Sequence, residues 1–551
     1  MYLFFGFRNT RFLYYLFISF LYHQISSDNI EIAFTVNNIN IFELDSFYII
    51  EQIKFQKISD DPFDYLLGIF EGSNYTTFSD ALPIGMIKEA ELSDSNSIEV
   101  NININVFLPY KYIRYNPPKS NKKYINNIKL FGHIYTDGED LDGKTFFTAT
   151  NLPLMIINTK NQVEPLSLEH YIDSRILIVS NNKLDLDLNQ TASIRLRGHS
   201  TSGRPKKPYK IKFDKKQKIL GISGKYKKWA ILANHYDKSL IRNILAFKIS
   251  EMIGLKFTPR CEPVDIIVNG NFRGNYFICD QVEVKEGRVD IEEISDNDIS
   301  GGYLIEIDIR ALEEEKFFLT NRGIIGEIKY PDSEDITKEQ ENYIKKYLNK
   351  LEKSTYNGNL KYLDLPSFYR YFIIQEFCGD IDSTLSSFNC HKKKGDDKLY
   401  FGPVWDYDLS FDNSDALFPT NKLPKFILYY GGSAGSTRDF FHNLIKTKDV
   451  MKNIEKTWIE LRADWFNFDN LNQFIEEQKE KLKDSANLNF LKWYGSKIGK
   501  GAKDYFDSVN VVTNYVKKRF DTLTYLIETF DFGGKLLKIN FFILDLIFIV
   551  Y

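Results

Sequence analysis

Two acidic residues in an aromatic stretch are well suited to metal chemistry. Asp406 and Asp408 lie in the segment FGPVWDYDLSF, which covers residues 401–411. The aromatic and aliphatic residues around them are strand formers, and successive strand residues point to opposite faces. The pattern therefore predicts a strand with both carboxylates on one face. Such a pair suits Mg²⁺, which takes oxygen ligands and needs only one or two carboxylates when phosphates supply the others.

A second acidic pair precedes the first. Asp380 and Asp382 lie in EFCGDIDSTLSSFN, and a short hairpin-like link separates this segment from residues 401–411. A single D-x-D pattern is more often a solvated strand edge than a metal site, because short motifs have many false positives. Two such pairs close together along the chain favour a functional site.

A basic strand–loop–strand segment lies further upstream, in SIRLRGHSTSGRPKKPYKIKF. The hydroxyl groups of Ser200 and Ser202 and the loop amides are donors suited to phosphates, and Lys210 or Lys212 on the return strand adds a point charge. The segment is not a Walker A loop. A surface hairpin with a solvated basic side is the alternative interpretation.

A helix is expected to follow this segment. Asp237 or Ser239 can cap it, and it should run to about Ile253. Arg242 and Asn243 near its start face either a site or solvent, and the sequence leaves both open.

Further elements should position the acids. An Asn269-Gly270 turn signal predicts a hairpin over residues 265–280. The stretch GGYLIEID places Glu306 and Asp308 on one strand face. The later chain shows helical spacing of apolar residues, and the expected helices are Lys338–Leu351, Leu365–Cys378, Asp439–Ile459, Leu471–Lys483 and Tyr505–Phe530.

Composition indicates a globular protein, and the β-rich and helical segments of the chain together predict an α+β fold. The chain has 551 residues, 43% of them hydrophobic and 26% charged, which predicts about two to four domains. The net charge of −3 gives no basic field of the kind that binds nucleic acid.

Both ends of the chain carry apolar segments. Arg8 and Arg11 precede the apolar run Phe12–Tyr22, which predicts a signal peptide over residues 1–27 and export through the secretory pathway. Residues 531–551 form an apolar tail interrupted by Asp545. This tail is too short to span a bilayer, and it would tie the protein to a membrane only as a lipid-anchor signal.

Between the leader and the acids, residues 28–151 alternate apolar and polar residues and predict a small β-sandwich.

Four cysteines allow one or two disulfides, Cys261–Cys279 and Cys378–Cys390, but spacing alone establishes neither. Sequons at Asn74 and Asn189 fit a secreted surface.

The ordered series RLRGHSTSG, KKPYKIKF, WAILANHYDKSLIRN, VNGNFRGNYFICDQVEV, GGYLIEID, DID and GPVWDYD resembles the spore-coat protein H (CotH) kinase-like family. The resemblance covers residues 152–530. It implies an atypical two-lobed protein-kinase-like domain that binds ATP and Mg²⁺ and phosphorylates Ser/Thr of secreted or coat proteins. The similarity is strongest to secreted CotH-like proteins of eukaryotic microbes.

The resemblance also implies roles for individual residues. Asp382 matches the catalytic acid and Asp406 the metal-binding acid, with Asp408 as the second acid of that motif. The family pattern has an Asn five residues after the catalytic acid. This chain has Ser387 there, which leaves Asn389 as the remaining second-metal candidate. Apart from the resemblance, the placement of the predicted hairpin makes Glu283 a candidate partner of the phosphate-binding lysine.

Three functions fit these observations. The first is a secretory-pathway protein kinase acting on secreted or surface proteins, which the lysines upstream of the acids favour. The second is a D-x-D metal-dependent glycosyltransferase that binds a nucleotide sugar. The third is a catalytically inactive surface binding protein, an adhesin, which Ser387 favours.

Overall fold

A computed structural model describes residues 30–530, apart from residues 39, 94–96, 119–124, 140–144, 181–185, 199, 296–298, 314–316, 414–425, 427–434 and 495–500. The predicted signal peptide and apolar tail lie outside the described residues. The chain divides into two compact units, which are described separately. Unit 1 comprises Met1–Arg195, Val264–Asn275 and Leu488–Gly499, and unit 2 comprises Leu196–Pro263, Tyr276–Asn487 and Lys500–Tyr551.

Helices and strands are both abundant, which confirms the predicted α+β class. The strands are β1 (Ile30–Ile32), β2 (Phe34–Asn38), β3 (Ile41–Lys57), β4 (Ile69–Ser73), β5 (Leu82–Met86), β6 (Glu99–Asn103), β7 (Tyr110–Asn116), β8 (Ile125–Ile134), β9 (Leu154–Thr159), β10 (Ile172–Val179), β11 (Leu188–Leu196), β12 (Tyr209–Gln217), β13 (Tyr226–Leu232), β14 (Cys261–Val268), β15 (Asn271–Asp280), β16 (Tyr303–Ile307), β17 (Phe317–Leu319), β18 (Ile325–Tyr330), β19 (Phe388–Lys392) and β20 (Leu399–Phe401). The helices are α2 (Arg242–Met252), α3 (Lys338–Tyr356), α4 (Leu365–Cys378), α6 (Ser436–Lys446), α7 (Val450–Arg462), α8 (Phe468–Tyr494) and α9 (Gly501–Glu528), and the short 3-10 helix η4 covers Ile309–Glu313.

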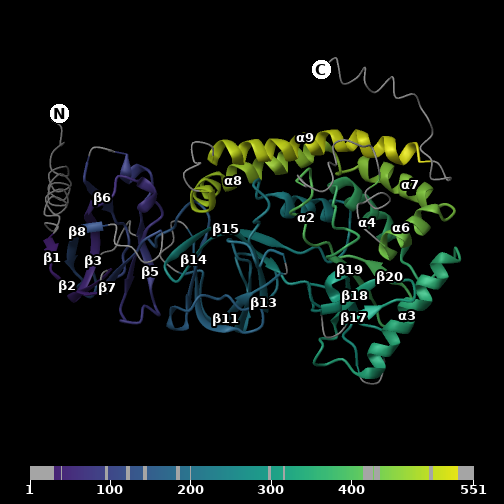
Figure 1. Ribbon diagram of the computed structural model, residues 1–551, viewed down its shortest axis with the longest axis horizontal. Coiled ribbons are helices and arrows are strands. Elements are labelled where there is room, and N and C mark those ends of the chain that lie inside the picture. Colours follow the sequence, from purple (N-terminus) through teal and green to yellow (C-terminus); the bar gives the residue numbers. More distant parts are fainter. Residues whose placement is uncertain are drawn as a thin grey trace, which may run out of the picture. The chain divides into compact units, whose positions relative to one another are not determined.

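Strands β1–β8 of unit 1 form one connected sheet, where the sequence predicted a sandwich. Its order is β1-β8-β3-β7-β4-β5, and β2 and β6 also pair with β3 (Figure 1). The long strand β3 changes partners along its length. Its first part pairs with β2 and β7, and its second part pairs with β6 and β8.

The apolar core of this sheet continues beyond residue 152, where the β-rich domain was expected to end. Phe55, Phe70 and Tyr115 of the sheet belong to the same buried cluster as Leu154 of β9 and Val179 of β10. A shared core of this kind makes the strands on both sides of residue 152 depend on one another. The division into units accordingly places the boundary at Arg195.

A closed barrel has the strand order β10-β11-β12-β13-β15-β14-β9. The predicted hairpin is present, since β14 and β15 are joined by Asn269 and Gly270, both with positive φ (49° and 73°). Positive φ at both turn residues matches a type I′ turn, which Asn-Gly favours.

Unit 2 contains a five-stranded sheet of order β17-β18-β16-β19-β20 together with the helices α2, α3, α4, α6, α7 and α9 and the part of α8 up to Asn487 (Figure 1). Helix α4 has the bounds that the sequence predicted. The segment predicted as one helix over residues 439–459 forms two helices, α6 and α7, because Asp449 between them adopts the left-handed region at φ 65°. Aromatic rings fill the helical core, among them Phe377, Trp458 and Phe520.

None of the helices in the described part of the chain is long and apolar enough to cross a membrane.

Candidate functional site

The loop that follows α4 carries the first acidic pair. Helix α4 ends at Gly379, which adopts the left-handed conformation (φ 66°) common at helix C-termini. The buried Asp380 then accepts a hydrogen bond from the backbone N–H of Asp382 (3.1 Å) through its own carboxylate. Asp382 is only partly buried. Asp380 therefore shapes the turn, and Asp382 is the acid of this pair that a substrate can reach.

The second acidic pair lies in an irregular loop. Strand β20 ends at Phe401, and Gly402 at φ 102° followed by Pro403 stops the strand alternation. Asp406 adopts φ 66° and its side chain is exposed, whereas Asp408 is buried. The prediction of a strand carrying both carboxylates on one face is therefore wrong, and the two acids are not equivalent.

Electrostatic coupling shows that the two pairs lie close together. Desolvation raises the pKa of Asp382, and the charges of Asp406 and Asp308 raise it further. Desolvation likewise raises the pKa of Asp408 well above its usual value, with contributions from Asp406, Asp237 and Asp382. The charges of these carboxylates therefore act on one another, and we call Asp382, Asp406 and Asp408 the acidic cluster.

Two arginines counter this negative charge around Asp406. Partial desolvation raises the pKa of Asp406, while Arg197 and Arg310 act to lower it. The guanidinium of Arg197 lies 5.2 Å from the ring centre of Trp405. Arg310 is fixed by Asp308, which accepts hydrogen bonds from its Nε (3.0 Å) and Nη2 (2.9 Å). The positive charges of Arg197 and Arg310 thus both favour the ionised form of Asp406.

A further cation would stabilise the acidic cluster. Neighbouring carboxylates with raised pKa values repel one another, and a divalent ion relieves this repulsion. Within the described residues, no group of three or more His, Cys, Asp or Glu side chains is arranged to hold a metal ion. Asp406 and Asp408 supply two carboxylates, which is as many as Mg²⁺ takes where phosphates and water provide its other ligands.

The basic loop is present upstream, and its residues differ in accessibility. Ser200 is exposed and Ser202 is partly buried. Lys210 and Lys212 lie on β12, whose alternating pattern is confirmed, since Tyr209, Ile211 and Phe213 are buried and Lys212 is exposed. Lys210 is partly buried. The role of Lys210 or Lys212 as a phosphate ligand stays a prediction.

A buried lysine in the same loop did not stand out in the sequence. Lys206 is 2% exposed, and its Nζ lies 4.8 Å from the ring centre of Tyr276. Desolvation lowers the pKa of His235, and the charges of Lys206 and Arg204 lower it further, so these three side chains form a basic group. Lysine is rarely buried without a specific role. The burial of Lys206 depends on tertiary packing, so the sequence of the loop does not reveal it.

Glu283 and Asn389 are held by neighbours that the sequence did not indicate. Glu283 accepts a hydrogen bond from Nη1 of Arg288 (2.6 Å), and Arg288 also binds Asp280. Asn389 is buried in β19, and its amide donates to the carbonyl of Ser387 (3.2 Å). It pairs with Glu306 across strands β16 and β19.

Helix α2 contacts the loop that bears the second acidic pair. Arg242 is buried, forms an ion pair with Asp237, and donates through Nε to the carbonyl of Ser410 (2.9 Å). Asp237 accepts the backbone N–H of Arg242 (2.9 Å), but the N-cap residue of α2 is Ile241, so the prediction that Asp237 or Ser239 is the N-cap is wrong. The sequence left open whether Arg242 and Asn243 face a site or solvent. Both side chains face the loop that bears the second acidic pair.

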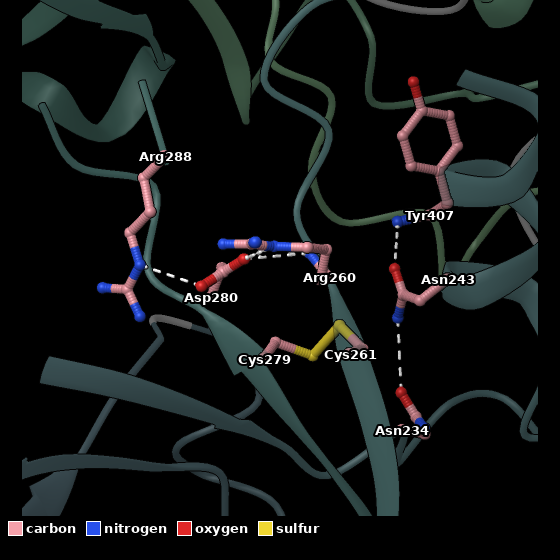
Figure 2. Close-up of a disulfide and its surroundings, with 8 residues drawn as sticks. All are labelled: Asn234, Asn243, Arg260, Cys261, Cys279, Asp280, Arg288 and Tyr407. Carbon is pink, nitrogen blue, oxygen red and sulfur yellow. Dashed lines mark hydrogen bonds and ion pairs between the residues drawn. A yellow bond between two sulfur atoms is a disulfide. The ribbon is translucent and has the colours of Figure 1, made fainter. Parts of the chain in front are cut away.

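A disulfide joins Cys261 to Cys279 across β14 and β15, as Figure 2 shows. Cys378 and Cys390 are free and buried, and burial raises the pKa of both thiols well above its usual value. Of the two bridges that the sequence allowed, only the first forms.

Comparison with known proteins agrees with this arrangement of motifs. The family described as CotH kinase protein matches residues 194–523, more than half of the chain. The chain belongs to the CotH kinase protein family. The CotH match includes the basic loop, helix α2 and both acidic pairs, and excludes the sheet of unit 1.

A search of curated proteins gave no match. Among solved structures, the chain is similar to a protein titled CBM62 from Clostridium thermocellum Xyl5A, with 28% identity and a TM-score of 0.15, over 17% of this chain and 70% of that one.

Proposed function

We propose that this CotH family member is an atypical protein kinase that uses ATP and Mg²⁺ to phosphorylate Ser or Thr of secreted or cell-surface proteins. The observation that supports this best is the convergence of Asp382, Asp406 and Asp408 in one cluster, flanked by Arg197 and Arg310. Phosphoryl transfer requires mainly positioning and charge neutralisation from the protein, and this cluster offers both. The two-lobed kinase arrangement is part of the same proposal.

Each acid has a role that suits its surroundings. Asp382 is accessible and anchored through its backbone, so it can accept the proton of a substrate hydroxyl group. Asp406 and Asp408 would hold Mg²⁺, which when bound neutralises charge on the β- and γ-phosphates. Asn389 is buried and bonded to Ser387, so we assign it no more than a supporting part.

The basic loop would bind the phosphates of ATP. Hydroxyl groups of Ser200 and Ser202 are donors, and Lys210 or Lys212 supplies positive charge from β12. The buried Lys206 adds a further positive charge to this loop. Glu283 is engaged by Arg288, so the earlier assignment of Glu283 to a phosphate-binding lysine is not carried forward.

We place this activity in the secretory pathway. The Cys261–Cys279 disulfide is typical of oxidising compartments, because cytosolic thiols are kept reduced. The predicted signal peptide over residues 1–27 and the exposed Asn74 of a glycosylation sequon agree with this location.

An inactive surface binding protein is the second candidate, and Ser387 favours it. This residue stands where the family pattern has an Asn, and it adopts φ 57°. A metal ligand missing from this position would weaken binding of a second Mg²⁺.

A transfer assay tests the proposal. Purified protein is incubated with Mg²⁺ and either γ-labelled ATP or a labelled nucleotide sugar, together with a Ser/Thr-rich acceptor protein, and Asp382→Asn serves as the control variant. Phosphate incorporated by the wild type and lost in the variant supports the kinase. Sugar transfer would indicate a glycosyltransferase, and no transfer of either group would favour the adhesin.

A further inference from the structure

A single amide side chain holds the backbone between the two acids of the second pair. Oδ1 of Asn243, in the first turn of α2, accepts the backbone N–H of Tyr407 at 2.7 Å (Figure 2). Tyr407 separates Asp406 from Asp408 in the sequence. The bond therefore acts on the peptide unit that sets how these two carboxylates are directed.

The backbone at this point needs such support. Asp406 has φ 66°, a region that is uncommon for residues other than glycine. Strained backbone of this kind persists only where the surroundings hold it. Fixing the N–H of Tyr407 fixes the peptide plane that follows Asp406, and so helps to keep the Asp406 side chain turned outward while Asp408 is buried.

Asn243 is itself oriented by a second asparagine. Its Nδ2 donates to Oδ1 of Asn234 at 3.3 Å, as Figure 2 shows. Asn243 and Asn234 are 6% and 7% exposed. Since bulk water has little access to this chain of bonds, a lost partner is not readily replaced.

We propose that Asn243 is a positioning residue that holds Asp406 in the orientation required for metal binding. Asn234 orients Asn243, and Arg242 binds the far end of the same loop at the carbonyl of Ser410. This assignment rests on the proposed function, because it concerns the metal-binding geometry of the same site.

The test compares Asn243→Ala with two further variants. Asn234→Gly removes only the orienting partner, and glycine tolerates the φ of 48° at that position. Asn349→Ala is the matched control. Its Oδ1 likewise accepts a backbone N–H, that of Asn321 at 2.7 Å, but it lies on α3 outside the acidic cluster.

Two measurements are made on the full chain. The first is hydrogen exchange at the amide of Tyr407 without nucleotide, and the second is the Mg²⁺ concentration that gives half-maximal ATP binding and transfer. We expect Asn243→Ala to speed exchange about tenfold and to raise the half-maximal Mg²⁺ concentration about tenfold. The rate at saturating Mg²⁺ should change little. Asn234→Gly should shift both quantities in the same direction by less, and Asn349→Ala should shift neither.

The outcomes separate this inference from the proposed function. If Asn243→Ala leaves exchange at Tyr407 at the control value, or speeds it without changing the Mg²⁺ dependence, Asn243 does not position Asp406. A wild type that binds no ATP would overturn the proposed function and, with it, the role of Asn243 in positioning Asp406 for metal binding. In that case a rise in exchange would assign Asn243 to loop structure alone. If Asn243→Ala does not fold, the same inference is tested with Asn234→Gly, by hydrogen exchange at Tyr407 and by the half-maximal Mg²⁺ concentration.

Discussion

The charged residues around Asp382 determine when it can act as a base. Desolvation and the charges of Asp406 and Asp308 raise its pKa, and Arg310 lowers it. Arg310 is therefore more than a partner of Asp308, since it keeps Asp382 ionised toward lower pH. Its own pKa is raised chiefly by the hydrogen bond to Asp308, so it stays charged throughout the range in which Asp382 titrates.

Replacing Arg310 should change the pH dependence of transfer. Arg310→Ala removes a charge that lowers the pKa of Asp382, so the active, deprotonated form appears only at higher pH. The acid limb of the pH–rate profile at saturating ATP and Mg²⁺ should shift to higher pH. Below the shifted pKa, the rate should fall about tenfold per pH unit. Arg310→Lys keeps the charge and should move the limb less. An unshifted limb in Arg310→Ala would show that Asp382 is not the base.

Asp408 should destabilise the metal-free protein at neutral pH. Its pKa is raised in the folded state, so folding favours the protonated form, and stability is lost as the pH rises from the usual pKa of aspartate to the folded-state pKa. Asp408→Asn should therefore raise the Tm at pH 7 without metal, while the exposed Asp521→Asn on α9 should not. The gain in Tm of Asp408→Asn should vanish at pH values below the usual pKa of aspartate. A lower Tm for Asp408→Asn at pH 7 would contradict this sign.

At the scale of elements, the sequence predicted best where local patterns decide. Helix α4, the Asn269-Gly270 hairpin and the alternation of β12 all follow from spacing and turn chemistry. The loop of residues 402–407 was predicted wrongly as a strand, because the strand-forming side chains were given more weight than Gly402-Pro403. The roles of Asn243 and Arg310 depend on contacts distant in sequence, and no local signal reveals them.

The disulfide should stabilise the β14–β15 hairpin. Cys261 and Cys279 are separated by 18 residues, and closing a loop of this size typically contributes about 2–4 kcal/mol. The double variant Cys261→Ala/Cys279→Ala should lose about that much in urea unfolding. Reducing agent should lower the midpoint of the wild type and leave that of the double variant unchanged. An equal response of both proteins to the reductant would show that the bridge does not form.

At the scale of the whole molecule, unit 1 shows where the domain prediction needs adjustment. The sequence placed a boundary near residue 152 because the chemical residues all lie after it. The buried cluster of unit 1 instead joins Phe55 and Phe70 to Leu154, Ile156 and Val179. The family match beginning at residue 194 lies close to the unit boundary at Arg195.

Truncation tests this boundary. A chain that starts at residue 152 loses the sheet that covers Leu154 and Val179, so it exposes apolar surface and should aggregate or melt without cooperativity. A chain that starts at residue 30 keeps the sheet and should be monodisperse. Size-exclusion chromatography and thermal unfolding of both shortened chains provide the measurement. A soluble, cooperatively folded 152–530 chain would show that the strands after residue 152 form an independent core.

The most direct test of the proposed function is a calorimetric titration of ATP into the wild type, Asp406→Asn and Asp382→Asn, with and without Mg²⁺. We predict Mg²⁺-dependent binding by the wild type and loss of that dependence in Asp406→Asn, because the triphosphate charge would no longer be neutralised. Asp382→Asn should bind ATP nearly as well as the wild type while its transfer rate falls about 10²–10⁴-fold. Absence of ATP binding by the wild type, or Mg²⁺-dependent binding that persists in Asp406→Asn, would contradict the account.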